Sequence, residues 1–415
     1  MRILLVAGYL PAPPTFGAAR RLHGLMSHLA STHSLTLLAL VDGGTDRSEE
    51  IRATGELCEH VTVVENDRRS GTLARRRGSK VGSLFSFQSY ERHAFRRPAL
   101  QAALDDLIAR GAFDVLQIES VLLGGYRLPA EIPTVLDEHN IEYDVLTRTA
   151  RSSGNVARRA YSLVNAAKLR REEEGLWRSV DGCAVPSERD AAIVRAAAPE
   201  THTAVVPNGV DTSFFLPRRP VGDERSILFF GALNYHPNVD ALEFFAGQIM
   251  PRIRDLVPAR LTVVGMGASP RIHALGRDDI EIVGKVADVR PVLDDAAVVV
   301  APLRFGGGTR LKILEAMAMA RPVVSTTLGA EGISARDGEH LLIADTPEAF
   351  ATAVARLLDD PSLRRAIGEA GRRLVEQHYD WRQSSEQLEQ VYRAVIARGQ
   401  PGPALPAVPP ARGGS

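Results

Sequence analysis

The sequence predicts an α/β protein with two Rossmann-like β/α/β domains that face each other across a deep interdomain cleft. Short apolar runs, of the kind that form strands buried on both faces, alternate with amphipathic helical stretches along the chain. The length of 415 residues suits two or three domains, each large enough for its own core. A polar, proline-containing stretch at residues 217–224 separates two β/α series. Because α/β sheets bind ligands beyond the carboxyl ends of their strands, the cleft is the predicted site.

The first domain is predicted to span residues 1–215. It opens with a buried strand, Arg2–Ala7, then a proline-rich loop that ends at Gly17, and then an amphipathic helix over residues 18–31. This opening is Rossmann-like, but it lacks the GxGxxG fingerprint, which disfavours a dinucleotide dehydrogenase. The remaining strands of this domain are expected at residues 35–41, 61–64, 114–118, 133–137, 182–185 and 204–206.

The second domain is predicted to span residues 216–380, with one long amphipathic helix at Val239–Ile253. A last helix, at residues 381–397, is expected to join the first domain. The tail at residues 399–415 is rich in Pro, Gly and Ala and is expected to be disordered. Strands of the second domain are expected at residues 227–230, 260–264, 280–282, 297–303 and 341–343.

Composition excludes several classes of protein. Lys+Arg and Asp+Glu both number 50, so no global basic field indicates a nucleic-acid partner. Cys58 and Cys183 are the only cysteines, which excludes a disulfide framework and a cysteine-rich zinc site and suits a reducing compartment. The chain has no signal-peptide pattern and no apolar stretch long enough to cross a membrane. We therefore expect a cytoplasmic protein.

One stretch, Arg68–Arg97, is locally basic. It holds nine Lys or Arg against a single acid, Glu91, with apolar and aromatic residues between them. Such a segment either contacts anionic lipid or an anionic acceptor, or is a solvated loop and helix that is simply basic. The first alternative predicts peripheral contact with the inner face of a membrane.

A glycine-rich turn lies within residues 301–333, which read APLRFGGGTRLKILEAMAMARPVVSTTLGAEGI. Thr309 can cap the helix that follows the three glycines. Two cations, Arg310 and Lys312, stand in its first turn, where a helix normally prefers anions. Cations together with free N–H groups suit a bound phosphate. The alternative is a plain tight turn, with Lys312 and Glu315 forming a surface ion pair.

The order and spacing of several motifs over residues 200–380 resemble the family-4 (group 1) retaining glycosyltransferases, which have the GT-B fold. In the first half of the chain the resemblance is weaker and depends on Gly17 and His139-Asn140. The motifs of the second half are Pro207–Asp211, Gly231, Gly265-Met266-Gly267, Gly284-Lys285-Val286, Gly306–Ile333, Glu315-Ala316-Met317-Ala318 and Pro322-Val323-Val324.

The resemblance implies roles for individual residues. Glu315 matches the second glutamate of the family's Glu-x7-Glu motif, which binds the ribose hydroxyls of the donor. Arg310 and Lys312 would contact the donor diphosphate, and His139 matches an active-site histidine near the transferred sugar. The resemblance thus implies His139, Arg310 and Lys312 as catalytic residues, and Gly17, Gly265, Lys285, Val286, Gly306, Gly307, Gly308, Thr309, Leu311 and Glu315 as donor-binding residues.

The chain departs from the family pattern at two places. Gly307 stands where the first glutamate of Glu-x7-Glu is expected, so a side-chain acceptor for the sugar hydroxyls is missing. The basic residues expected after the first strand of the second domain are also absent, because Gly231 is followed by Ala-Leu-Asn-Tyr-His. Arg310 and Lys312 are therefore expected to carry more of the phosphate charge.

The reaction implied by the resemblance is the retaining transfer of a hexosyl group from a nucleotide-diphosphate sugar to an acceptor hydroxyl, in exopolysaccharide or glycolipid assembly. The acceptor would be a sugar, a lipid-linked sugar or a glycoside. No Asp-x-Asp pair occurs in the chain to hold a divalent ion on the phosphates, so no metal and no cofactor are expected. Two alternatives stay open: a GT-B-fold sugar-nucleotide epimerase or hydrolase, and a non-catalytic nucleotide-sugar-binding protein.

Overall fold

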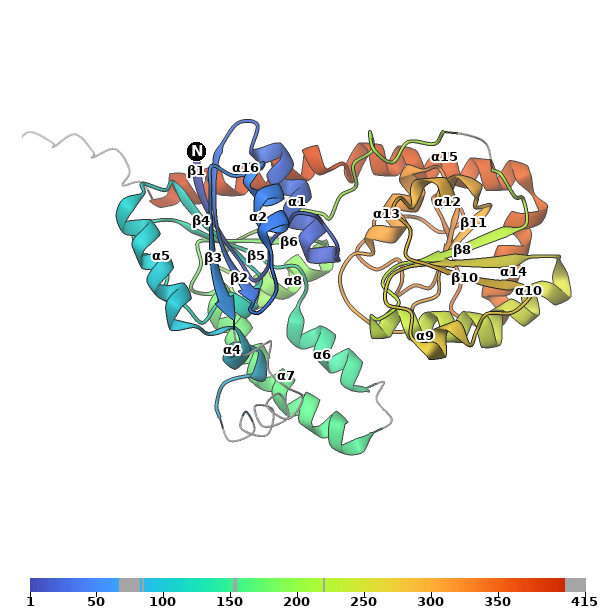
Figure 1. Cartoon of the computed structure of the whole chain (residues 1–415), viewed down its shortest axis with the longest axis horizontal. Coiled ribbons are helices and arrows are strands. Elements are labelled where there is room, and N and C mark those ends of the chain that lie inside the picture. The colour runs from blue at the N-terminus through green and yellow to red at the C-terminus, as the bar shows by residue number, and fades with distance from the viewer. Residues whose placement is uncertain (67–82, 84–85, 152–154, 219–220, 400–415) are drawn as a thin grey trace, which may run out of the picture.

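The computed structural model describes residues 1–66, 83, 86–151, 155–218 and 221–399 (Figure 1). The chain forms two parallel-sheet α/β domains, which confirms the predicted fold class. Most of the basic stretch Arg68–Arg97 and the tail from residue 400 lie outside the described residues. Within the described part, no helix is long and apolar enough to cross a membrane.

The first sheet has seven parallel strands in the order β3-β2-β1-β4-β5-β6-β7. Successive residues of β1 point into two different cores: Leu5 packs among α1 and α16, whereas Leu4 packs among α5, α7 and α8. Burial on both faces explains why this strand is an unbroken apolar run. The strands are β1 Arg2–Ala7, β2 Ser34–Asp42, β3 His60–Asn66, β4 Val115–Glu119, β5 Thr134–Asp137, β6 Gly182–Val185 and β7 His202–Val205.

Helices cover both faces of this sheet (Figure 1). Ser187 caps one of them, as its hydroxyl accepts a hydrogen bond of 3.2 Å from Asp190 N. The helices are α1 Gly17–Leu29, α2 Ser48–Gly55, α4 Tyr90–Phe95, α5 Pro98–Arg110, η1 Val121–Leu123, α6 Glu142–Arg151, α7 Val156–Trp177 and α8 Glu188–Ala197.

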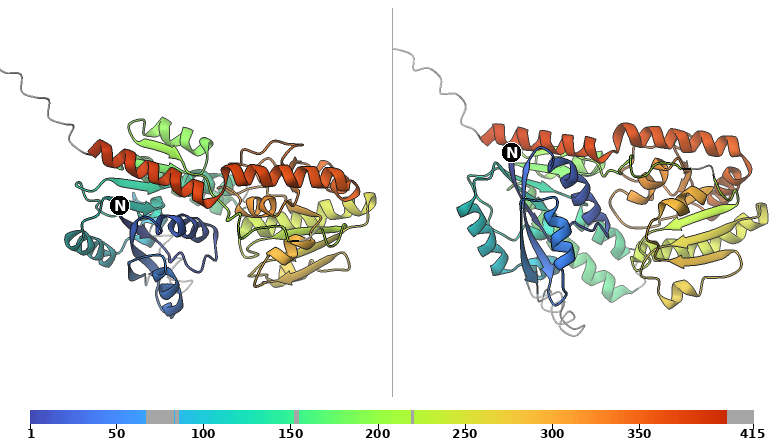
Figure 2. Two further views of the ribbon diagram at one scale, coloured as in Figure 1. Left: turned by 90° about the horizontal axis from the view of Figure 1, so that it is seen from above. Right: turned by 45° about the horizontal axis from the view of Figure 1, so that its top comes forward.

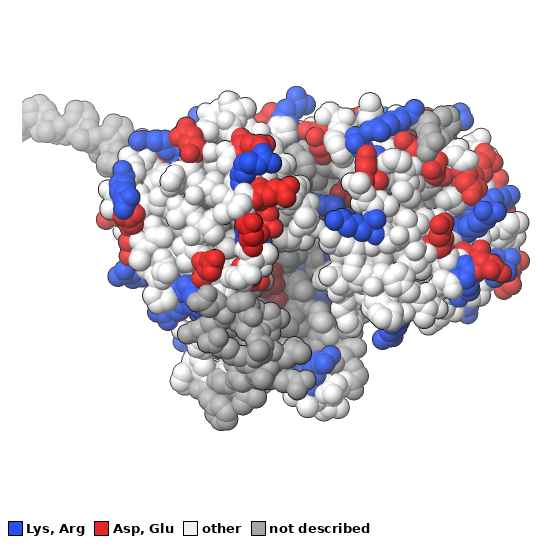
Figure 3. All heavy atoms as spheres, in the orientation of Figure 1, with Lys and Arg blue, Asp and Glu red and all other residues white. Residues whose placement is uncertain are grey.

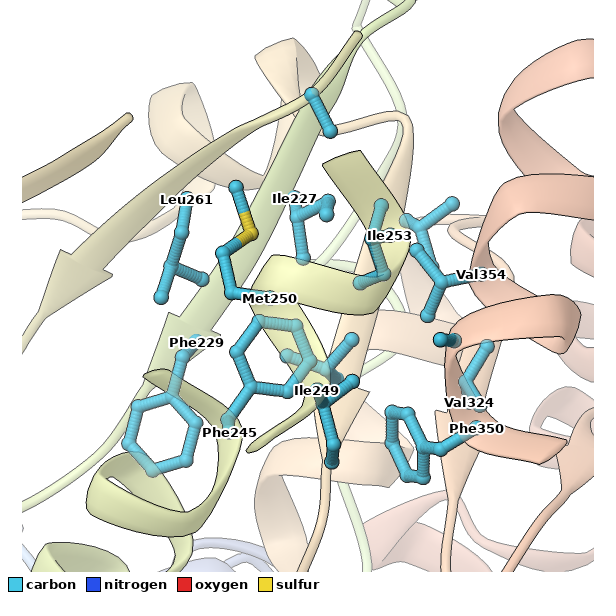
Figure 4. Packing of buried hydrophobic residues seen from close by; sticks show 14 of the residues in the cluster. Ile227, Phe229, Phe245, Ile249, Met250, Ile253, Leu261, Val324, Phe350 and Val354 are labelled. Carbon is cyan, nitrogen blue, oxygen red and sulfur yellow. The ribbon is translucent and has the colours of Figure 1, made fainter. Parts of the chain in front are cut away.

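The second sheet has six parallel strands in the order β10-β9-β8-β11-β12-β13. Its core on one face is aromatic, with the rings of Phe245 and Phe350 packed edge to face at 6.0 Å (Figure 4). The strands are β8 Ser226–Phe230, β9 Arg260–Val264, β10 Ile280–Gly284, β11 Val298–Ala301, β12 Val323–Ser325 and β13 Leu342–Ile343.

The helix predicted at Val239–Ile253 is divided into three parts in the structure. A π-helical turn, η2 Phe245–Ile249, separates α9 His236–Phe244 from α10 Met250–Leu256. Pro251 explains the division, because it has no N–H to donate to the preceding turn and its ring crowds that backbone. The other helices of this domain are α11 Pro270–His273, α12 Arg290–Asp295, α13 Leu311–Ala318, α14 Pro347–Asp359 and α15 Pro361–His378.

The last two helices follow one another along the molecule and together span both domains (Figure 2). α15 packs on α13 in the second domain, and α16, Trp381–Gly399, packs on α1 in the first. The indole of Trp381 lies against Gly24 of α1, where an added Cβ would stand 2.4 Å from its Cδ2 atom. The absence of a side chain at Gly24 therefore allows α16 to approach α1.

Replacing Gly24 by alanine should destabilise the protein. The new Cβ forces the Trp381 ring out of its place, at an expected loss of about 1–3 kcal/mol in the free energy of unfolding. Gly55→Ala, in α2, is the matched control because an added Cβ there meets nothing within 4 Å. Urea unfolding of both variants checks this. Equal midpoints for Gly24→Ala and Gly55→Ala would contradict the close packing of α16 on α1.

Candidate active site

His139 lies among carboxylates at the carboxyl ends of β4 and β5. Its Nε2 atom is 2.8 Å from Glu119 Oε2 and 3.8 Å from Asp137 Oδ2. Burial alone would lower the pKa of His139, but the hydrogen bond and charge of Glu119 outweigh it and raise the pKa above its ordinary value. The imidazole is therefore held in its cationic form at higher pH than a free histidine.

A buried arginine neutralises the same cluster. Arg21 of α1 donates to both oxygens of Asp137, at 2.8 Å from Nε and 2.6 Å from Nη2. Glu119, Asp137 and His139 offer ligand atoms within 4.8 Å of one another, the donor types that a metal ion would use. Both Asp137 oxygens already face the guanidinium, and His139 Nε2 faces Glu119. The cluster is thus an ion-pair network whose positive charge comes from Arg21, and we assign no metal to it.

A pocket of about 390 Å³ opens beside His139 in the first domain. Its lining joins polar groups at the strand ends to apolar and aromatic side chains of the proline-rich loop. The lining residues are Gly8, Tyr9, Leu10, Ala12, Pro13, Thr15, Phe16, Ala18, Val41, Asp42, Arg47, Glu50, Phe95, Glu119, Ser120, Leu122, Leu123, His139, Asn140 and Glu142.

The predicted glycine turn connects β11 to α13 and takes a backbone that glycine favours. Gly306 has φ +121° and Gly308 has φ +75°, conformations that residues with a Cβ rarely adopt. The prediction that Thr309 caps the helix is wrong: Arg310 is the N-cap residue and makes no side-chain cap. Thr309 Oγ1 is instead turned toward Gly332 and has no partner among the described residues.

Arg310 has unused donors inside the protein. Its Nη1 atom donates to the carbonyl of Gly307, whereas Nε and Nη2 are buried and meet no acceptor in the described part of the chain. Burial lowers the pKa of this guanidinium from its ordinary value. Buried donors without acceptors are unfavourable, so this arrangement favours an anion beside the glycine turn.

Lys312 lies at the carboxyl end of β8, although it belongs to α13. Its Nζ donates to Asn238 Oδ1 at 2.8 Å and is 4.7 Å from the ring centroid of Phe229. An added Cβ at Gly231 would stand 3.2 Å from the same Nζ. Lys312 therefore places a cation next to Gly231, after which the sequence lacks the expected basic residues. Burial, and then the charge of Arg310, lower the pKa of Lys312 to about 7.

The two domains touch through the glycine turn. An added Cβ at Gly307 would stand 2.2 Å from Val145 Cγ2 of α6, and one at Gly308 would stand 2.2 Å from Asn140 Oδ1. A glutamate at position 307 thus has no room in this arrangement. The turn lies directly against Asn140, the neighbour of His139, and this contact brings the predicted residues of the two domains together.

Glu315 is buried and paired with a residue that the sequence reading missed. Arg20 Nη1 of α1 lies 2.5 Å from Glu315 Oε1, across the domain boundary. Arg20 stands one turn beyond Gly17, and this proximity to the predicted Gly17 was the only sequence signal for it. An added Cβ at Gly17 would meet nothing within 4 Å, so open space lies in front of the first turn of α1.

Three predicted donor-side residues lie away from this contact. Gly265 follows β9 and packs on the backbone of Gly231, where a Cβ would stand 1.8 Å from the carbonyl oxygen. Lys285 and Val286 follow β10, two strands from β8 at the edge of the sheet. The side chain of Lys285 is exposed there, and Val286 packs on the core of the second domain. Leu311 instead packs between the cores of both domains.

Charge on the surface is mixed, as zero net charge implies. Figure 3 shows Lys and Arg interspersed with Asp and Glu on both domains, and the face is indented where the domains meet. Two parallel-sheet α/β domains that meet at a glycine turn are the architecture of the GT-B glycosyltransferases.

The sequence comparisons agree with this class. Residues 224–360 match the family described as glycosyl transferases group 1, and residues 17–214 match glycosyltransferase family 4. The chain is 27% identical to glycogen synthase of Mycobacterium tuberculosis over an alignment 448 positions long, which covers 98% of each protein. The chain belongs to the family-4, group 1 glycosyltransferases, as the sequence motifs predicted.

Solved structures show the same fold. Sucrose-phosphate synthase from Thermosynechococcus elongatus superposes with a TM-score of 0.70 at 19% identity, covering 96% of this chain and 99% of that one. HepE from Anabaena, in complex with UDP and glucose, superposes with a TM-score of 0.68 at 14% identity, covering 95% and 100%. At these identities the likeness shows the fold.

Gly307→Ala should impair the enzyme by separating the glycine turn from α6. Displacing reacting groups by about 1 Å lowers rates by roughly 10- to 100-fold. Val145→Ala removes the atom that the new Cβ meets, so the double variant Gly307→Ala/Val145→Ala should recover most of the activity. Release of nucleoside diphosphate measures the effect, with Val145→Ala alone as the control. Full activity of Gly307→Ala would show that the contact has no role.

Binding of a nucleoside diphosphate should take up a proton through Lys312. The free amine has a pKa of about 7, so at pH 8 it is mostly neutral, while a bound diphosphate favours its charged form. Affinity for UDP should then fall by up to about tenfold per pH unit above pH 7. Calorimetry in buffers of different ionisation enthalpy measures the proton. Lys312→Arg stays charged and should bind UDP without uptake; uptake in both proteins would assign the proton elsewhere.

Proposed function

We propose that this glycosyltransferase moves a hexosyl group from a nucleotide-diphosphate sugar to an acceptor hydroxyl with retention of configuration. One observation carries the proposal: the pocket of the first domain and the glycine turn of the second meet at Asn140. Asn140 lines the pocket, and its Oδ1 atom is 2.2 Å from the position of a Cβ on Gly308. An acceptor in the pocket would thus be next to a donor held by the turn.

The donor diphosphate would lie between the glycine turn and the first turn of α1. Arg310 offers two buried nitrogens, Nε and Nη2, that have no acceptor among the described residues, and Lys312 offers an ammonium group. The helix α1 begins after Phe16 without a side-chain cap, so its first N–H groups face the open space at Gly17. Charge that develops on the leaving diphosphate is stabilised by these preorganised donors and cations.

Glu315 would bind the ribose of the donor, as a carboxylate accepts hydrogen bonds from both hydroxyls of a vicinal diol. A uridine diphosphate donor is the first to test, because HepE was solved with UDP and glucose. With glycine at position 307, the transferred sugar has no carboxylate from the turn. His139 and Asn140, on the opposite domain, are among the polar groups that line the pocket and would face this sugar.

Retention requires the acceptor to attack from the side that the diphosphate leaves. The contact of Gly308 with Asn140 places pocket and turn side by side, which supports this geometry. We propose a metal-independent reaction because Arg310, Lys312 and the α1 terminus already supply positive charge for the diphosphate. We also propose a cytoplasmic enzyme of exopolysaccharide or glycolipid assembly, with peripheral contact to anionic membrane through Arg68–Arg97.

Arg310→Ala should lower kcat by about 10²–10³-fold, the effect of removing one donor to a developing charge. Arg304→Ala is the matched control: Arg304 is exposed on the same loop and pairs with Asp240 at 2.6 Å, so kcat should stay near that of the native enzyme. Turnover is measured on a panel of UDP-, GDP- and ADP-sugars. A native rate for Arg310→Ala would remove Arg310 from the reaction.

Two further measurements test the mechanism. Addition of EDTA should leave turnover unchanged, and loss of activity that a divalent ion restores would overturn metal independence. Proton NMR of the first-formed product should show the anomeric configuration of the donor. Donor consumption without any glycoside product would favour the hydrolase alternative, and binding of UDP without turnover on any acceptor would favour the non-catalytic one.

A further inference from the structure

We infer that the sugar unit that enters the pocket of the first domain is uncharged, and that the lining of this pocket rejects phosphorylated acceptors. The inference rests on the proposed function, since it treats this pocket as the acceptor site. It concerns the residues at the ends of β2, β4 and β5 and at the start of α2, and not the donor side.

Carboxylates outnumber the cationic groups in the described lining of the pocket, where four acids face Arg47 and His139, whose raised pKa favours its cationic form. Four acidic residues line it, two from strand ends and two from helices. Arg47 is the one lysine or arginine in the described lining, and its Nη1 atom lies 2.5 Å from Glu50 Oε2. Its Nε donates to the backbone carbonyl of Asp42 at 3.4 Å. The guanidinium is therefore engaged within the pocket wall. The four acids are Asp42, Glu50, Glu119 and Glu142.

Glu119 is a buried acid of the pocket wall, and His139 balances part of its charge. It is only 1% exposed and accepts hydrogen bonds from Gln117, from Tyr9 at 3.4 Å and from His139 at 2.8 Å. Burial and the nearby Glu119 carboxylate raise the pKa of the Tyr9 hydroxyl well above its ordinary value. A phosphate in the pocket would meet more carboxylates than cations, and like charges repel more strongly next to buried groups than in bulk water.

The same lining suits a neutral sugar. Carboxylates accept hydrogen bonds from sugar hydroxyls without having to be neutralised by the ligand. Aromatic rings supply flat apolar surface: Phe16 is 48% exposed and packs edge to face on Tyr9 at 5.1 Å, and Phe95 lies on the pocket wall. Apolar surface with a few convergent polar groups is what a small-molecule site needs.

The cleft is therefore polarised. Cations that lie on the donor side, Arg310 and Lys312, attract a diphosphate, whereas the pocket on the other side presents acids. This division directs the two substrates to different halves of the cleft, because each half repels charge of the sign that the other attracts. A phosphate elsewhere on a long lipid-linked acceptor, outside the pocket, is compatible with this arrangement.

Binding measurements on pairs of ligands test the inference without turnover. Each pair consists of a neutral ligand and its own monophosphate, and the affinities of the two for the full chain are compared by ligand-observed NMR. The neutral ligands are methyl α-D-glucopyranoside, methyl α-D-mannopyranoside and myo-inositol. The neutral member of at least one pair should bind about tenfold more tightly, which is about 1.4 kcal/mol. Equal or tighter binding of the phosphates, or no binding of any neutral ligand, would overturn the inference.

Variants identify the residues that set this preference. Glu50→Gln removes one acid and releases Arg47 for an incoming phosphate, so the preference for neutral ligands should shrink at least threefold. Glu49→Gln, on the adjacent exposed position of α2 and outside the pocket lining, should leave it unchanged. An identical preference in Glu50→Gln and native protein would exclude Glu50. A Glu50→Arg variant should bind the phosphates more tightly than the native protein does. This gain in affinity would support the charge explanation even if Glu50→Gln does not fold.

Turnover separates this inference from the proposed function. If no UDP-, GDP- or ADP-sugar yields nucleoside diphosphate with any acceptor, the proposed transfer is wrong. The relative affinities for neutral and phosphorylated ligands still test the inference about the pocket in that case. If transfer occurs to phosphorylated acceptors as fast as to their neutral partners, the proposed transfer stands and the inference about the pocket is wrong.

Discussion

The candidate site of the first domain depends on the buried ion pair between Arg21 and Asp137. Both side chains are almost fully buried, and two parallel hydrogen bonds join them. The same guanidinium also donates to Val206 O at 2.9 Å and to Asn208 Oδ1 at 3.0 Å, beyond the end of β7. Removing one partner of such a pair costs roughly 3–5 kcal/mol because the other charge is left buried alone. This network fixes α1, the end of β5 and the start of the interdomain connection relative to one another, and therefore the positions of Arg20 and His139.

The contact between the two domains explains why position 307 holds glycine instead of the first glutamate of the donor motif. Gly307 lies against Val145 of α6, so a side chain there would separate the turn from the first domain. The helix α6 is itself held by Glu173 of α7, whose carboxylate accepts from Glu142 N at 2.7 Å and Tyr143 N at 3.0 Å. Burial raises the pKa of Glu173 to about 8. Glycine at position 307 thus allows the turn to lie against α6, and Glu173 helps to hold that helix in place.

Local patterns predicted the strands and the glycine turn, because both are encoded by neighbouring residues. Leu4 and Leu5 are buried in different cores on the two faces of the sheet, so neighbouring residues of the strand are both apolar. Gly306 and Gly308 have the positive φ values that the glycine turn needs. Features that depend on distant parts of the chain were not predictable. The pairing of Arg20 with Glu315 joins residues 295 positions apart, and Lys312 reaches the end of β8 only through the packing of α13. The cap assigned to Thr309 was wrong because its hydroxyl turns toward Gly332 instead of the helix.

The pair of Arg20 and Glu315 connects α1 of the first domain to α13 of the second. Arg20 contacts one oxygen of the carboxylate, Oε1. Because the two oxygens of a carboxylate together offer about four acceptor sites, this ion pair leaves acceptor sites for other donors. In the proposed function, Glu315 would therefore accept hydrogen bonds from the ribose hydroxyls while it still holds Arg20. The same side chain would thus join the two domains and bind the donor, because the ion pair and the diol use different lone pairs of one carboxylate.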